Sequence, residues 1–296
     1  MKNIRAYIYP TITFMLWGSL YVISKPAMEH VPPVTLLFLR YLLASVILFF
    51  IVKNRFHKLP KVKKEHRMLF LVVGFLGYGL AIAFQQIGND MLDASMAALI
   101  NSMNPVFIFV MAFLILKEKI TGPKIIGVLM SIGGVYIILG ASSGDVNAAG
   151  LLISLGSVFF WSLSSILVRS ISAHYDPVVI TFYGIALSLI LLAPSSLIEV
   201  HFRSCSFTPS VIISILYLAI FATALAHVLW NKGLQMASAG TCSLFYPVQP
   251  LTSSILGIVV LHEAMSVSFI AGAVIISAGI IISLLKPPFK GRLSES

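Results

Sequence analysis

The sequence is poor in charged residues and has almost no cysteine. Only 10% of its 296 residues are Asp, Glu, Lys or Arg, whereas 58% are hydrophobic. A soluble domain has about 25% charged residues, and a chain this apolar has too few polar groups to cover a surface in contact with water. An ordinary soluble enzyme, a nucleic-acid-binding protein and a disordered chain are therefore excluded. Two cysteines, Cys205 and Cys242, are too few for a disulfide framework, and we expect both to be free.

The usual sequence signatures of bound ions and cofactors are missing as well. No group of His and Cys residues has the spacing of metal ligands, so no metal site is predicted. The Gly-x-x-x-x-Gly-Lys-Ser/Thr sequence that binds nucleotide phosphates is absent, which argues against direct use of ATP. We expect no cofactor.

Apolar segments make up most of the chain. A helix needs about 20 mostly apolar residues to cross a bilayer. Ten segments of about this length span 7–24, 34–52, 68–88, 93–116, 123–140, 148–170, 177–195, 210–233, 239–261 and 267–285. The first is interpreted as a membrane helix rather than a signal peptide, because no small-residue cleavage site follows it. We therefore predict an all-α integral membrane protein with ten transmembrane helices.

The positions of the basic residues explain the net charge of +10. With the N-terminus placed in the cytoplasm, 17 of the 20 Lys and Arg residues lie in cytoplasmic loops or tails. Only Lys25 and Arg203 lie outside, and Arg40 lies within a span. This excess of cytoplasmic positive charge is the usual topology signal of multi-pass proteins. We expect a multi-pass protein of the cell (inner) membrane with both termini in the cytoplasm.

The two halves of the sequence resemble each other at a shift of 144 to 145 residues. The matching positions include Trp17 with Trp161, Pro33 with Pro177, and Asn104-Pro105 with Gln249-Pro250. We divide the chain into a first five-helix repeat, residues 1–145, and a second, residues 146–296. Because five is odd, the second repeat enters the membrane upside down. Inverted repeats are typical of secondary transporters, whose substrate site lies near the bilayer midplane where the repeats meet.

These features carry a family resemblance. Its motifs are Trp17-Gly18, Phe38-Leu39-Arg40-Tyr41, and two copies of a Pro-to-Glu segment that end at Glu118 and Glu263. With these motifs the whole chain resembles the EamA-like, ten-helix exporters of the drug/metabolite transporter superfamily. The resemblance implies export of amino acids, related metabolites or toxic small molecules. It also implies a central cavity lined by the first, third, fourth, sixth, eighth and ninth helices.

Two prolines mark candidate substrate-binding residues. Pro105 and Pro250 lie about halfway along their spans, and each follows an amide, Asn104 or Gln249. Each proline removes one helical hydrogen bond, so the carbonyl of Tyr246, four residues before Pro250, is expected to be unpaired. Polar points of this kind suit a water-filled cavity better than lipid, and we expect these residues to line it. The alternative is that the kinks serve packing and the amides satisfy the freed carbonyls.

Aromatic and polar side chains in other spans complete the predicted substrate site. Trp17 and Trp161 occupy equivalent mid-span positions, and an aromatic, amide-rich cavity suits a zwitterionic or aromatic molecule. His227 and Asn231 share one helix face, and Gln86 corresponds to Asn231 in the repeat. The remaining candidates are Tyr21, Tyr78, Asn101, Ser165 and Trp230. Interhelical hydrogen bonding is the alternative for the polar members and for Gln85.

Other residues receive structural interpretations. Arg40 lies inside the second span; because that helix is peripheral in the family, we expect pairing with carbonyls or headgroups rather than with substrate. Glu118 and Glu263 end their spans and are interpreted as fixing loops, with gating as the alternative. Small residues spaced seven apart favour close packing of the fifth and tenth helices; they are Gly127, Gly134, Gly272 and Gly279.

The energy source and two rival functions stay open. No Asp or Glu lies at mid-membrane, so the protein is either a facilitator or exchanger, or a proton antiporter that uses His227. A nucleotide-sugar or lipid-type carrier of the same fold would call for a more basic cavity. A membrane-embedded enzyme is a further alternative, but the close pair Asp90 and Asp93 has no metal-binding companion. The expected partners are a small-molecule substrate and membrane lipid, with the protein a monomer or homodimer.

Overall fold

The computed structural model describes residues 5–116, 122–140, 147–236, 242, 245, 246, 248–262 and 266–283, whose helices form ten membrane-crossing segments. In the first repeat these are α1 (Arg5–Met28), α2 (Pro33–Phe56), η1 (Lys64–His66) with α3 (Arg67–Val72), η2 (Val73–Ala81) and α4 (Ile82–Met91), α5 (Ala94–Asn101) with α6 (Asn104–Leu116), and α7 (Gly122–Gly140). In the second they are α8 (Ala148–Ile171), α9 (Pro177–Phe202), α10 (Pro209–Tyr217) with η3 (Leu218–Leu225) and α11 (Ala226–Met236), α13 (Val248–Leu261), and α14 (Val267–Ser283). The predicted all-α fold is confirmed.

Apolar side chains cover the outside of the bundle as well as its interior. Five helical stretches of 24 to 28 residues within the described ranges have mean hydropathies between 2.0 and 2.4. Large apolar side chains such as Phe50, Leu197 and Ile213 are 60%, 74% and 66% exposed. Water would solvate such a surface poorly, whereas acyl chains solvate it well. The chain is therefore a multi-pass membrane protein.

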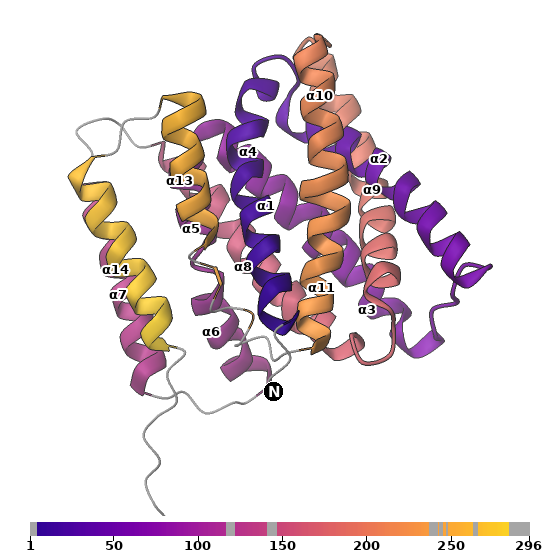
Figure 1. Ribbon diagram of the computed structural model, residues 1–296, viewed down its shortest axis with the longest axis horizontal. Coiled ribbons are helices and arrows are strands. Elements are labelled where there is room, and N and C mark those ends of the chain that lie inside the picture. Colours follow the sequence, from indigo (N-terminus) through magenta and orange to yellow (C-terminus); the bar gives the residue numbers. More distant parts are fainter. Residues whose placement is uncertain are drawn as a thin grey trace, which may run out of the picture.

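The helix contacts follow the repeat. α2 packs on α9 and α7 packs on α14, and each pair consists of equivalent helices from the two repeats. Other contacts occur in matched pairs: α1 packs on α13 as α8 packs on α6, and η2 packs on α9 as η3 packs on α2. Figure 1 shows the α7–α14 pair and the α2–α9 pair at opposite sides of the molecule. A two-fold relation between the repeats produces this pattern.

The α2–α9 pair shows that the repeats are inverted. Near the end of α9, the Glu199 carboxylate accepts hydrogen bonds from the backbone N–H groups of Val34 (3.2 Å) and Thr35 (2.7 Å) at the start of α2. At the other end of the pair, Arg55 of α2 forms an ion pair of 2.8 Å with Asp176, which caps the start of α9. Both carboxylates balance the positive end of a helix dipole. Equivalent helices therefore run antiparallel, so the two-fold axis lies in the membrane plane.

The fourth and ninth spans are interrupted just before their prolines. Between α5 and α6, the backbone N–H of Met103 donates to the carbonyl of Ile100 at 3.0 Å. The equivalent bond of the second repeat, from Val248 to Phe245, is also 3.0 Å long. These i to i+3 bonds tighten the chain into a turn, and two residues after each donor a proline has no N–H to donate. Both spans are thus broken helices rather than bent continuous ones.

The third and eighth spans each contain a π-helix, η2 and η3, at equivalent positions. A π-turn bonds residue i to i+5 and is frequent at functional sites. Each such turn holds more residues than an α-turn, so it rotates the face presented by the helix that follows. Residues of α4 and α11 therefore face directions that a continuous α-helix would not predict.

Small residues allow helices of the two repeats to approach each other closely. A Cβ atom on Gly134 in α7 would lie 2.6 Å from Cγ1 of Ile276 and 2.8 Å from the Gly272 carbonyl oxygen in α14. The predicted close packing of α7 and α14 is confirmed at this point. On Gly18 in α1, a Cβ atom would lie 2.6 Å from the carbonyl oxygen of Gln249 in α13.

The two basic residues predicted to lie outside meet at one end of the bundle. Arg203 Nη1 lies 3.5 Å from Asp90 Oδ2, and Lys25 Nζ donates to the Asp90 backbone carbonyl at 3.2 Å. The Arg55–Asp176 ion pair lies at the other end, beyond the opposite termini of α2 and α9.

Candidate functional site

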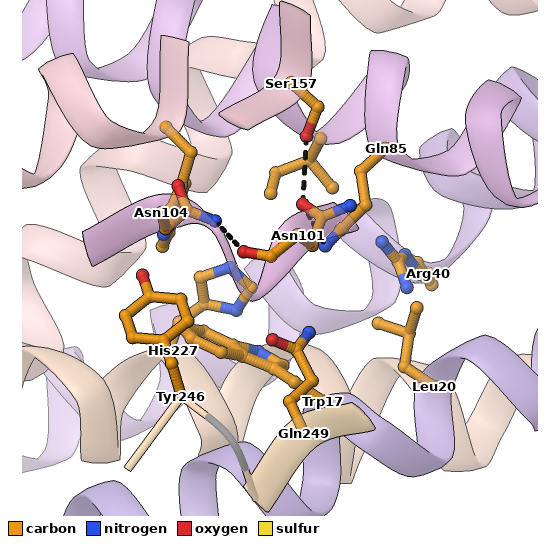
Figure 2. Close-up of a pocket in the computed structure, with 12 residues that line it drawn as sticks. Trp17, Leu20, Arg40, Gln85, Asn101, Asn104, Ser157, His227, Tyr246 and Gln249 are labelled. Atoms are coloured by element: carbon orange, nitrogen blue, oxygen red, sulfur yellow. Dashed lines mark hydrogen bonds between the residues drawn. The ribbon is translucent and has the colours of Figure 1, made fainter. Parts of the chain in front are cut away.

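A small buried cavity lies where the two repeats meet. Its walls come from α1, α2, α4, the broken α5–α6 segment, α8, α11, the start of α13 and the turn before it. The lining residues are Trp17, Leu20, Arg40, Ile82, Gln85, Asn101, Asn104, Ser157, Trp161, His227, Tyr246 and Gln249 (Figure 2). The space open to the centre of a water-sized sphere is about 20 Å³, which holds about one water molecule. A metabolite needs a pocket of roughly 300 Å³ or more, so the lining helices must move apart to admit one.

Aromatic rings form one wall of the cavity. The Trp17 ring centroid lies 5.6 Å from that of Trp161 and 5.4 Å from that of His227, both edge to face. The Trp161 and His227 centroids are 5.8 Å apart. Because Trp17 and Trp161 are equivalent residues, the repeats meet at this contact. Rings arranged in this way offer flat faces for stacking and attract cations.

His227 presents one unpaired nitrogen. Its Nδ1 lies 2.8 Å from the carbonyl oxygen of Thr223. A carbonyl oxygen can only accept, so in the neutral ring Nδ1 carries the hydrogen and Nε2 holds the lone pair. The buried Nε2 has no hydrogen-bond partner in the part of the chain that the structure describes. It is free to accept a hydrogen bond from a ligand, or a proton when the cavity opens to water.

Amide and hydroxyl groups form the facing wall. Asn101 Oδ1 accepts a hydrogen bond from Ser157 Oγ at 3.3 Å. Gln85 Nε2 lies 3.5 Å from the same Oδ1 atom and donates to the Tyr21 hydroxyl at 2.6 Å. Figure 2 shows Ser157, Gln85 and Asn101 across the cavity from Trp17. A ligand between the two walls would meet rings on one side and hydrogen-bonding groups on the other.

The two proline sites satisfy their carbonyl groups in different ways. The Asn101 carbonyl, which would pair with residue 105 in a continuous helix, accepts from Asn104 Nδ2 at 2.5 Å. The Tyr246 carbonyl accepts from the backbone N–H of Gln249 at 3.0 Å. The prediction that the Tyr246 carbonyl is unpaired is therefore wrong, because the turn before α13 brings this N–H within reach. Side chains rather than freed carbonyls make the cavity polar.

Seven of the residues predicted to bind substrate line the cavity, and their contact with substrate stays a prediction. They are Trp17, Asn101, Asn104, Trp161, His227, Tyr246 and Gln249. The other eight do not line it: Tyr21, Tyr78, Gln86, Pro105, Ser165, Trp230, Asn231 and Pro250.

Three of these eight support the lining from outside. Asn231 Nδ2 donates to the hydroxyls of Tyr78 and Thr181, both at 2.9 Å, and the Tyr78 ring lies 5.2 Å from that of His227. The Trp230 ring lies 5.7 Å from that of Trp17. These contacts fix the orientation of the aromatic wall.

Three others make contacts away from the cavity. Gln86 Nε2 lies 2.9 Å from the sulfur of Met28. Ser165 Oγ donates to the carbonyl of Trp161 within its own helix, at 2.8 Å. Pro250 lines an apolar groove between α13 and α14, whereas the adjacent Gln249 lines the cavity.

The prediction for Arg40 is wrong. Its side chain is 0% exposed and lines the cavity, so it does not reach headgroups. None of its guanidinium nitrogens has a hydrogen-bond partner among the described residues, carbonyls included. α2 is not peripheral here, because it packs on α4, α9 and η3.

Leu20, Ile82 and Ser157 also line the cavity without having been predicted to bind substrate, and so does Gln85, for which interhelical hydrogen bonding was the alternative. Helical periodicity could have found two of them, since Leu20 lies three residues after Trp17 and Ser157 four before Trp161. Glu118 and Glu263 lie outside the described residues, so their interpretation as loop-fixing residues stays a prediction.

Comparisons with known proteins agree with this architecture. A model of the EamA-like transporter family matches the chain twice, over residues 4–140 and 148–285. The uncharacterized transporter YvbV of Bacillus subtilis is 26% identical over 281 residues, which cover 95% of this chain and 92% of the relative. The probable amino-acid metabolite efflux pump of Salmonella typhimurium is 27% identical over 292 residues, which cover 92% of each chain. A protein of known crystal structure, 19% identical, has a similar fold, with a TM-score of 0.68 over 94% of this chain and 96% of that one.

Proposed function

The chain belongs to the EamA-like transporter family, and on this premise we propose that it is a secondary transporter that exports small metabolites by alternating access. Amino acids and related compounds are the proposed substrates. The observation that carries this proposal is the buried cavity between the repeats, with an aromatic wall facing a wall of amides. The name of the Salmonella relative supports the export of amino-acid metabolites.

In this mechanism the broken helices are the moving parts. Asn104 and Gln249 lie at equivalent breaks and both line the cavity, so movement at either break changes its walls. The two breaks contact the other repeat through small residues, Gly18 against Gln249 and Ser162 against Asn104. Contacts between small side chains allow these helices to slide past each other with little steric hindrance. Because the repeats are inverted, the movement that opens one side of the cavity has an equivalent that opens the other.

A transport role, rather than catalysis, is proposed because the family and the relatives are transporters. We place the protein in the cell membrane with both termini in the cytoplasm, since the Lys and Arg residues gather in the loops that this orientation places inside. The end with Lys25, Asp90 and Arg203 is then the outer face. Export would be driven either by the metabolite gradient or by protons that His227 carries.

Counterflow into proteoliposomes tests the proposal. The purified protein is reconstituted with one unlabelled compound inside, and uptake of the labelled compound is followed for amino acids, aromatic metabolites, cationic drugs and a nucleotide sugar. We expect saturable exchange of amino acids or aromatic metabolites that empty liposomes lack. Exchange of the nucleotide sugar alone, or of no compound, would contradict the proposed substrate class.

A further inference from the structure

Arg40 is the only buried charged side chain in the described part of the chain. Its Nε, Nη1 and Nη2 atoms are all inaccessible to solvent and all lack a hydrogen-bond partner among the described residues. Figure 2 shows its guanidinium entering the cavity from the side opposite Asn104 and Tyr246. A guanidinium carries five N–H donors in a planar fork, so the cavity holds a complete and unused anion-binding group.

Burying an unpaired guanidinium is strongly unfavourable unless a counter-charge is supplied. The described residues supply no counter-charge inside the cavity, because its lining contains no Asp or Glu. Three carboxylates of the described residues are engaged at the ends of the bundle instead. Glu199 accepts three hydrogen bonds at the start of α2, Asp176 pairs with Arg55, and Asp90 pairs with Arg203.

Arg40 makes a cation–π contact with an aromatic ring next to it in the chain. Its guanidinium carbon lies 5.7 Å from the ring centroid of Tyr41. A cation–π contact of this kind offsets only part of the cost of burial. The missing interaction is one that a planar anion makes best, because a carboxylate matches the fork with two parallel hydrogen bonds.

The aromatic wall is suited to a positive group. The lone pair on Nε2 of His227 is unpaired, and the rings of Trp17 and Trp161 lie beside it. An ammonium group donates hydrogen bonds to an imidazole lone pair and is attracted to aromatic faces. The cavity thus has an anion-binding group in α2 and cation-binding groups in α1, α8 and α11.

We propose that Arg40 binds the carboxylate of the transported molecule, so that the substrates are carboxylates, above all zwitterionic α-amino acids, and not cationic amines; this step rests on the proposed transport function. A single guanidinium also disfavours nucleotide sugars, whose two phosphates carry more negative charge than Arg40 balances. Arg40 is then a substrate-contacting residue, and α2 belongs to the transport pathway.

Paired substrates test the proposal. Each amino acid accepted by the wild-type protein is compared in counterflow with the amine that remains when its carboxylate is removed, for example phenylalanine with phenethylamine. The variants are Arg40→Gln, Arg40→Lys and, as a surface control, Arg67→Gln. Loss of a hydrogen-bonded charge contact weakens binding by about 10- to 100-fold, and we expect this increase in the half-saturating concentration for the amino acid with Arg40→Gln. Arg40→Lys should recover part of the affinity, and Arg67→Gln should behave as wild type.

A binding readout separates a substrate contact from a structural role. Removing an unpaired buried charge should not destabilise the fold, so Arg40→Gln should melt in detergent no earlier than wild type. Phenylalanine should raise the melting temperature of the wild-type protein and not that of Arg40→Gln. Repeating the assays with methanesulfonate in place of chloride tests whether Arg40 holds an inorganic anion instead.

Three results would overturn the carboxylate contact while leaving transport intact. These are equal counterflow of amine and amino acid by the wild type, wild-type affinity in Arg40→Gln, and a chloride requirement that disappears with Arg40→Gln. If the wild type exchanges no compound in the panel, the transport proposal itself fails.

Discussion

Replacing Asn104 with alanine should destabilise the protein more than replacing Gln249 with alanine does. The two residues immediately precede the prolines of equivalent broken helices. Asn104 Nδ2 is the donor to the Asn101 carbonyl, and Pro105 offers no backbone N–H in its place. In the second repeat the Tyr246 carbonyl is paired by the backbone N–H of residue 249, which alanine keeps.

The magnitude follows from the carbonyl that Asn104→Ala leaves unpaired. A buried unpaired polar group costs about 1–3 kcal/mol, whereas side-chain hydrogen bonds between membrane helices average about 0.6 kcal/mol. Asn101 is 2% exposed, so we expect a loss of about 1–2 kcal/mol. Ser162 keeps the backbone oxygen of residue 104 as acceptor at 3.2 Å and adds little to this loss. At about 2–4 °C per kcal/mol, the melting temperature should fall by roughly 2–8 °C.

The buried thiol of Cys242 provides the assay. In a Cys205→Ser background, its reaction with a fluorogenic maleimide reports unfolding of the detergent-solubilised protein on heating. Asn104→Ala should lower the midpoint more than Gln249→Ala, which loses the contact of Gln249 with Tyr21 but leaves no carbonyl unpaired. Adding Pro105→Ala to Asn104→Ala restores an N–H donor at residue 105 and should recover most of the loss. Equal destabilisation at both positions, or no recovery in the double variant, would refute the assignment of these hydrogen bonds.

Three further outcomes are expected. Trp161→Ala removes the ring that meets Trp17 and should reduce counterflow by roughly 10-fold or more without changing the yield of folded protein, whereas Trp161→Phe should keep part of the activity. Normal transport by the alanine variant would contradict the assignment of Trp161 to the substrate cavity. Gly134→Leu overpacks the α7–α14 contact and should destabilise the protein by about 1–3 kcal/mol in the Cys242 assay, whereas Gly133→Leu, whose side chain meets open space, should not. Similar unfolding midpoints for the two variants would disprove the contact. If export responds to an imposed pH gradient, His227→Gln should abolish the response in counterflow, because Arg40, Tyr41 and Tyr78 around it do not titrate near neutrality; an unchanged response would exclude His227 as the proton carrier.

The membrane spans and the repeat could be read from the sequence because they depend on sums over many residues. Each span needs only enough consecutive apolar residues, and inversion follows from an odd number of helices per repeat. The repeat also located part of the cavity. Residues near a two-fold axis meet their own equivalents, which is why the matched pairs Trp17 with Trp161 and Asn104 with Gln249 line one space.

The rest of the cavity depends on geometry that pattern alone does not contain. Gln86 and Asn231 are equivalent, as predicted, yet both make packing contacts while the neighbouring Gln85 reaches the cavity. The π-helix before α4 sets which of the two adjacent glutamines faces inward, and its sequence carries no signal for a π-turn. Arg40 was misjudged because its partners depend on the depth and direction of α2, which hydropathy does not report.

Accessibility of the cavity lining to water is the most direct test of the proposed transport path. In a Cys205→Ser, Cys242→Ala background, Ser157→Cys places a thiol in the cavity, and Ser254→Cys places one in the apolar groove between α13 and α14. A membrane-impermeant thiol reagent should modify Ser157→Cys from each side of the membrane, with substrate slowing the reaction, and should leave Ser254→Cys unmodified. A Ser157→Cys thiol that reacts from neither side would show that the space between the repeats is a closed core and not a path for substrate.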